Sequence, residues 1–164
     1  MEYLNFKILL IVALIPLLIS KVWYAPKVFG GKLHNSLGLE SKNTNHYFDI
    51  FLMYLYGLFV AYMLCMIVVH QFGFFLLHFN ELFIDGVSSE SILGFSDFMN
   101  TQGHKHRTLG HGLIHGVEAG LLMGLFFIGT LTIIEKRPFK SLMIHLGFFI
   151  TTFGIMGALI SAYL

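Results

Sequence analysis

The chain has 164 residues, of which 56% are hydrophobic and only 12% charged, and its mean hydropathy is +0.76. A water-soluble domain usually carries about 25% charged residues, so this chain has roughly half the charge that a soluble surface needs. The apolar content excludes a disordered chain, and a formal charge of +1 offers no basic face to a nucleic acid. The single cysteine, Cys65, permits no intrachain disulfide. The composition therefore predicts an integral membrane protein whose first partner is the lipid bilayer.

Four apolar stretches are long enough to cross a bilayer as helices, which takes about 20 residues. They run over residues 4–23, 49–79, 109–134 and 142–164. No small-residue cleavage site follows the first stretch, so we expect it to remain as a helix rather than to be removed as a signal peptide. The second stretch is longer than the hydrocarbon core requires, and we expect it to tilt, to project from the membrane or to bend near Gly73.

These stretches predict an all-α fold. We expect a single domain over residues 1–164, built as an integral membrane four-helix bundle with one longer extracytoplasmic loop over residues 80–108. Residues 91–100 within that loop are weakly amphipathic and predict a segment that lies along the outer interface.

Lysine and arginine residues in short loops favour the cytoplasmic side and set the predicted orientation. The connection over residues 24–47 contains three lysines and one glutamate, and the turn between the last two stretches contains Lys136, Arg137 and Lys140. The loop over 80–108 is richer in acidic residues than in basic ones. We therefore expect both basic connections in the cytoplasm, and the 80–108 loop and both termini outside it.

The end of the first stretch carries a recognisable motif. It matches Trp-Tyr-x-Pro-x-x-Phe-Gly through Trp23, Tyr24, Pro26, Phe29 and Gly30. In this motif the chain resembles the bacterial membrane proteins catalogued as domain of unknown function 1761. Their motif continues to a further tryptophan, in whose place this chain has Leu33.

Two segments near the other end of the chain are similar to the same family. Glu135-Lys136-Arg137-Pro138 resembles its Glu-x-Arg-Pro turn, and the segment Ile144–Phe148 resembles its following Ile-x-x-Gly-Tyr sequence. The resemblance implies a compact four-helix protein of the bacterial cytoplasmic (inner) membrane, and it supplies no activity.

The residues of the first motif also have a direct physical interpretation. Trp23 and Tyr24 are amphipathic rings suited to the level of the lipid headgroups, and Pro26 prevents the helix from continuing smoothly. We interpret Trp23, Tyr24 and Pro26 as an interface anchor rather than as a ligand site.

Glycines recur every fourth residue along the third stretch, at Gly112, Gly116, Gly120 and Gly124. Small residues at this spacing let a neighbouring helix backbone approach closely, which is what drives helix association in lipid. The stripe predicts helix packing, either within one chain or against a partner, which would be a second copy or a larger membrane-protein complex.

The histidines are the second unusual feature. Nine are present, and four of them, His104, His106, His111 and His115, lie close together at the start of the third stretch. His111, His115 and Glu118 share one face of a helix, nearly opposite the glycine stripe, and we expect that helix to be largely enclosed by protein. A carboxylate at the depth of Glu118 must pair or take up a proton, and its expected partners are His115 and His70.

Three interpretations of this cluster remain open. His70, His111, His115 and Glu118 are candidate metal ligands, since two imidazoles on adjacent turns can chelate one ion. A haem is the second possibility, with His70 opposite His111 or His115 as axial ligands. The residues could also serve a proton-coupled function or be structural polar groups.

The sequence contains no complete catalytic constellation, so we assign no catalytic residues and expect no enzyme. We expect a small structural or accessory membrane protein that packs with itself or with a larger complex, without an assigned cofactor. The alternative is a metal-binding, haem-binding or proton-coupled membrane protein that uses the His/Glu cluster.

Overall fold

The computed structural model describes residues 5–38, 46–80 and 89–164, and in these ranges the chain forms helices and connections without a β-strand. Within these ranges, three helical stretches are long and apolar enough to cross a membrane, namely α4 (His46–Val68), the continuous run Leu109–Ile134 and α10 (Phe139–Tyr163). The bent pair Lys7–Trp23 and Pro26–Leu37 makes a fourth if it is counted as one span. The prediction of an all-α membrane fold is confirmed.

The first span is bent where the sequence places a proline. Helices α1 (Lys7–Val12) and α2 (Ile15–Trp23) are followed by the π-helical turn η1 (Pro26–Gly30) and by α3 (Gly31–Leu37), with a bend of 53° between the two halves. Ala25 is extended, with φ −60° and ψ 142°. The ring of Pro26 disfavours a helical backbone in the residue before it, so the change of direction follows from the sequence.

The second apolar stretch is broken, although not near Gly73. Helix α4 ends before Val69, which is extended with φ −112° and ψ 91°, and α5 (His70–Leu77) begins directly after it. Gly73 lies inside α5. Val69 is fully buried. Two residues further on, the side-chain amide of Gln71 donates hydrogen bonds to backbone carbonyls of a distant segment. Tertiary contacts therefore fix the position of the break.

The predicted loop over 80–108 is partly helical. Helix α7 (Ser89–Gln102) includes the amphipathic stretch that the sequence indicated. Gln71 joins this region to α5, because its side-chain amide donates to the carbonyls of Gln102 and Lys105 at 2.7 and 2.9 Å.

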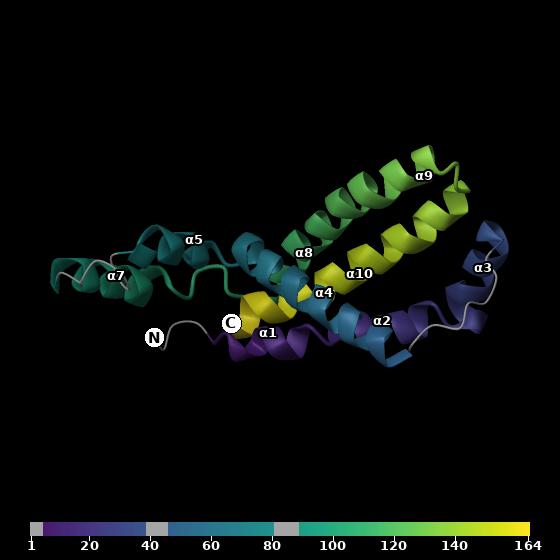
Figure 1. Ribbon diagram of the computed structural model, residues 1–164. Helices are drawn as coiled ribbons and strands as arrows, with labels where there is room; N and C mark the ends of the chain where they lie inside the picture. Colours follow the sequence, from purple (N-terminus) through teal and green to yellow (C-terminus); the bar gives the residue numbers. More distant parts are fainter. Residues whose placement is uncertain (1–4, 39–45, 81–88) are drawn as a thin grey trace.

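Helices α8 (Leu109–Gly124) and α10 form an antiparallel hairpin whose two arms lie side by side in Figure 1. The turn η2 (Leu125–Gly129) and helix α9 (Thr130–Ile134) continue the first arm. A Cβ atom added at Gly112 would overlap the carbonyl oxygen of Gly157, and one added at Gly116 would overlap that of Phe153. At Gly120 it would lie 2.7 Å from the carbonyl oxygen of Phe149. The glycine stripe therefore packs against α10 of the same chain.

The core lies where α1, α2, α4 and α10 meet. Its fully buried side chains include Val12, Ala61, Leu64, Cys65, Met156 and Ile160. Cys65 is fully buried and acts here as a small packing residue. The outward faces of the long helices carry large exposed apolar side chains, among them Phe59, Ile114, Leu122 and Phe126. Such faces are suited to contact with lipid.

The α8–α10 hairpin has two distinct ends, and α5 and α7 extend beyond the one that carries the histidines (Figure 1). The histidine end contains the break at Val69, the start of α8 and the last turn of α10, where the backbone N–H of Asn5 donates to the carbonyl of Leu164. The basic end contains α3, α9 and the start of α10, with Arg137 and Lys140.

Candidate metal site

Two of the candidate ligands are presented by the first turns of α8. Thr108 is the N-cap residue, and its Oγ1 accepts a hydrogen bond from the backbone N–H of His111 at 3.2 Å. This bond fixes the start of the helix, so His111 and His115 are one turn apart on the same face. The third candidate, His70, is the first residue of α5 and comes directly after the break at Val69.

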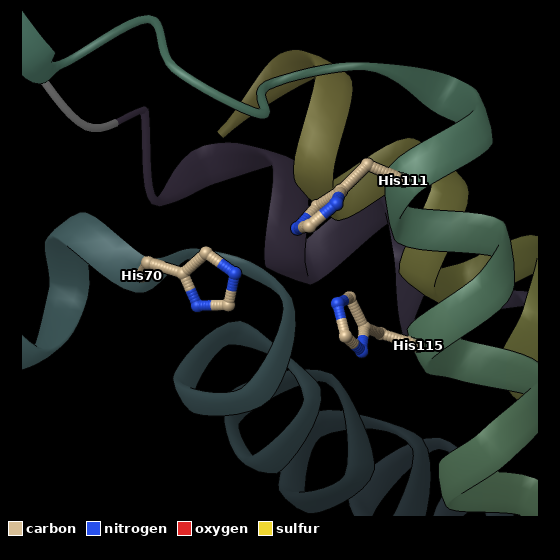
Figure 2. A group of neighbouring side chains, drawn as sticks. All are labelled: His70, His111 and His115. Carbon is tan, nitrogen blue, oxygen red and sulfur yellow. The ribbon is translucent and has the colours of Figure 1, made fainter.

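The three imidazoles converge from these two segments. One ligand nitrogen from each of His70, His111 and His115 lies within 4.8 Å of the others. The ring centroids of His111 and His115 are 4.5 Å apart, and that of His70 lies 5.1 and 5.7 Å from them, respectively. Figure 2 shows the rings arranged around a common space between α8 and the α4–α5 junction.

One nitrogen of this group is buried and finds no partner in the described part of the chain. The Nε2 atom of His111 has no hydrogen bond to any described residue, although it is closed off from solvent. Buried polar atoms are nearly always paired, so such an atom calls for an explanation, and an absent ion is among the usual ones.

Glu118 lies beside the group rather than within it. Its Oε2 atom is 3.4 Å from Nδ1 of His115, and 62% of its side chain is exposed on the described chain. Of the partners expected for Glu118, His115 is in contact with it. Because the carboxylate faces Nδ1, the Nε2 atom of His115 remains for a ligand. The carboxylate can orient this imidazole, a role that carboxylates often have behind metal-bound histidines.

The expected enclosure of α8 is absent among the described residues. The side chains of Leu113, Ile114 and Glu118 are exposed. Helix α8 makes its closest contact through glycines, and close packing on one face leaves the opposite face free of a covering helix.

A fourth histidine borders the group. The ring centroid of His106 is 5.1 Å from that of His111 and 6.0 Å from that of His70. The sequence placed His106 in the cluster but gave no reason to count it as a ligand, because its spacing from His104 and His111 is not that of one helix face. His106 approaches through a turn with φ +61°, an uncommon backbone conformation for a residue with a side chain.

This turn is held by α10. The hydroxyl of Ser161 donates to the carbonyl of His106 at 3.1 Å, and Nε of Arg107 donates to the carbonyl of Ser161 at 3.0 Å. Burial lowers the pKa of the Arg107 guanidinium. The last turn of α10 thus positions the segment that leads into α8. The histidines of this region therefore lie on backbone that hydrogen bonds hold in place.

Three converging imidazoles suit a borderline metal ion such as Zn²⁺. In a tetrahedral site with Zn–N distances of about 2.0–2.1 Å, ligand nitrogens are roughly 3.4 Å apart, so a closure of about 1.4 Å at most would bring the nitrogens to that spacing. The same convergence disfavours a haem, because the third imidazole occupies the space that a porphyrin between two axial ligands would need.

The residues assigned to an interface anchor lie at the basic end. Trp23 Nε1 donates to the carbonyl of Ile144 at 3.0 Å, and the Tyr24 hydroxyl lies 2.9 Å from Nδ1 of His145. Both aromatic residues therefore join the first span to α10. Their placement at the level of the lipid headgroups stays a prediction.

The comparison with protein families agrees with the motifs. The family described as protein of unknown function (DUF1761) matches residues 8–161, nearly the whole chain. Neither a curated protein nor a solved structure matches the chain. The chain is thus a member of the DUF1761 family, as its Trp-Tyr-x-Pro and Glu-x-Arg-Pro motifs indicated.

Proposed function

We propose that this membrane protein binds one divalent transition-metal ion through His70, His111 and His115. The observation that carries the proposal is the convergence of the three imidazoles, one of which has a buried Nε2 atom without a partner among the described residues. The carboxylate of Glu118 contacts Nδ1 of His115 and orients its imidazole, so that Nε2 faces the ion. The ring of His106 lies close to that of His111, near enough to reach a fourth coordination position.

The donor set specifies the class of ion. Imidazole suits Zn²⁺, Cu²⁺, Ni²⁺ and Fe²⁺, whereas Mg²⁺ and Ca²⁺ prefer oxygen ligands. With three protein ligands, one position of a tetrahedral Zn²⁺ remains for water, for a small ligand or for His106. The bound ion joins the α4–α5 junction to α8, so it also stabilises the histidine end.

The test is a direct binding measurement. The protein is purified in mild detergent through a tag that contains no histidine, treated with a chelator and titrated with Zn²⁺ by calorimetry. We expect one ion per chain. The variants His70→Ala, His111→Ala and His115→Ala should each lose stoichiometric binding, because each removes one of three ligands.

The matched control is His46→Ala, which removes an exposed histidine whose ring contacts only Tyr47 among the described aromatic residues. Circular dichroism shows whether each variant is folded. Unchanged Zn²⁺ binding in folded His111→Ala and His115→Ala would refute the proposal, and so would an equal loss in His46→Ala.

A second candidate is an accessory role in which α8 associates with a second copy of the chain. One observation favours it: Glu118 is 62% exposed on a face with Leu121, Leu122 and Leu125. A charge at the centre of a bilayer is disfavoured by about 3 kcal/mol on insertion scales, so this face gains from being covered. The glycine stripe gives no further support, since α10 already occupies it.

Analytical ultracentrifugation in detergent tests the second candidate. A dimer that dissociates in Leu122→Lys, with His70→Ala still dimeric, would support self-association. A monomer at all concentrations would contradict it and would leave the metal proposal unaffected.

The chain is expected in the bacterial cytoplasmic membrane with the histidine end outside the cytoplasm, so the ion would come from that side.

A further inference from the structure

The basic end of the molecule contains a second set of converging residues, independent of the histidine cluster. Here the end of the first span packs on the start of α10. The ring centroids of Tyr24 and Phe148 lie 5.1 Å apart, and a Cβ atom at Gly147 would lie 2.8 Å from the Trp23 indole. These contacts, with the hydrogen bonds of Trp23 and Tyr24, hold the two segments at a fixed separation.

Two hollows adjoin at this junction and share Leu33 and His145 as lining residues. The first, of about 500 Å³, is lined in addition by Leu37, Glu135 and Arg137. The second, of about 530 Å³, is mainly apolar, and the rest of its lining is Tyr24, Gly30, His34, Met53, Phe148 and Phe149. Each volume lies in the range of small-molecule sites, roughly 300–1,000 Å³. Together the hollows form one open cavity at the surface, with a charged part and an apolar part.

The basic end is positive on balance, and the charged residues that line this cavity are Arg137 and Glu135. A third hollow of about 250 Å³ beside Trp23 and Phe29 is lined by Lys32 and Lys140. Glu135 is the counter-charge to Arg137 and contacts its Nε atom. A guanidinium has five N–H donors in a planar fork, so Arg137 keeps its terminal nitrogens for a phosphate while Nε faces Glu135.

We propose that this cavity binds an anionic phospholipid, with the phosphate at Arg137 and an acyl chain along Met53, Phe148 and Phe149. A headgroup alone would leave the apolar hollow unfilled, and a neutral amphiphile would leave the terminal nitrogens of Arg137 without an anionic partner. Basic pockets between membrane helices on the cytoplasmic side are a known setting for anionic headgroups. The positive-inside rule assigns the basic end to that side.

The test uses native mass spectrometry of the full chain in detergent, at about 0.15 M ionic strength, where distant charges are screened. Phosphatidylglycerol is titrated, with phosphatidylcholine and inorganic phosphate as comparison ligands. We expect saturable binding of phosphatidylglycerol, and no saturable binding of phosphatidylcholine or inorganic phosphate. Hydrogen bonds between charged groups are stronger than those between neutral ones, so Arg137→Gln should weaken binding about tenfold or more. Arg137→Lys keeps the charge and loses the planar fork, so it should weaken binding less than Arg137→Gln, and it keeps the proposal testable if Arg137→Gln does not fold.

Two variants separate a specific site from general charge attraction. Lys27→Gln removes an exposed cation at the same end that lines none of the three hollows, and it should change the affinity less than about twofold in the screened solution. Glu135→Gln should increase the affinity for phosphatidylglycerol, because it removes the carboxylate that competes with the phosphate for Arg137.

Three results of these measurements would contradict the proposal. Equal losses in Lys27→Gln and Arg137→Gln would show unspecific attraction and overturn the proposal. Equal affinity for phosphatidylcholine would refute the proposed preference for an anionic headgroup. Equally tight binding of inorganic phosphate would refute the proposed contribution of the apolar hollow to binding.

Discussion

Nδ1 of His115 lies 3.4 Å from Oε2 of Glu118, one turn further along α8. This arrangement gives a membrane-helix carboxylate a partner in its own helix and leaves the opposite nitrogen of the imidazole directed toward His70 and His111. Figure 2 shows one nitrogen of His115 on the side of the other two rings and the second turned away. The carboxylate therefore matters for the metal proposal although it is not itself a ligand.

The first prediction concerns this carboxylate. Glu118→Gln should weaken Zn²⁺ binding by about 10–100-fold without abolishing it, because an amide orients the His115 imidazole less well and does not raise its basicity. Competition with a fluorescent zinc chelator measures the change. Glu135→Gln, a carboxylate replaced at the other end of the molecule, should leave the zinc affinity unchanged, and equal effects of the two variants would contradict the role of Glu118.

The second prediction concerns the contact between α8 and α10. Gly116→Ala should lower the free energy of unfolding by about 1–3 kcal/mol, because the new Cβ meets the backbone of Phe153 and forces the helices apart. Thermal unfolding in detergent measures the loss. Gly110→Ala is the matched control on the same helix, since a Cβ placed there has no described atom within 4 Å apart from the local backbone of its own helix. Equal stability of the two variants would argue against the close contact.

The third prediction concerns the bond between the first span and α10. Tyr24→Phe removes only the hydroxyl that lies 2.9 Å from Nδ1 of His145. A typical intramolecular hydrogen bond contributes about 0.5–1.5 kcal/mol, and we expect a loss of stability of that size. Tyr47→Phe, at a tyrosine that is 84% exposed, should have no effect. A double-mutant cycle with His145→Ala shows whether the loss belongs to this pair.

The fourth prediction concerns orientation in the membrane. A reporter fused after Lys136 should be active on the cytoplasmic side, and one fused after Leu164 should be active on the opposite side, because the basic connections favour the cytoplasm. The reverse pattern at both positions would invert the topology. It would also place the anionic-lipid cavity in the other leaflet.

Much of the candidate site follows from local periodicity. His111 and His115 share a helix face because they are four residues apart, and the order of the spans brings His70 to the same end. The same reasoning could not find His106, because its approach depends on a positive φ angle and on a hydrogen bond from Ser161, far away in the sequence. Nor could it show that Glu118 would stay exposed, since the partner of each helix face is decided by packing.

A similar part of the fold was predictable from the sequence. Apolar length located the spans and Pro26 located the first bend, because both effects act within a few residues. The second break fell at Val69 rather than near Gly73, because burial of Val69 and the hydrogen bonds of Gln71 outweigh the local preference of glycine. The glycine stripe predicted a close helix contact, and only the structure identifies α10 as the partner.

The contact of α8 with α10 has a consequence for the entropy of assembly. Where Gly112 and Gly116 meet Gly157 and Phe153, backbone lies directly on backbone, and glycine has no rotamers to lose when the surfaces meet. Lipid offers no hydrophobic driving force between helices, so a contact that gains dispersion energy at almost no cost in side-chain freedom is favourable there. The two arms are also joined by a short turn. We therefore expect this hairpin to be the most persistent unit of the chain in the membrane, and amide hydrogen exchange should be slowest along it.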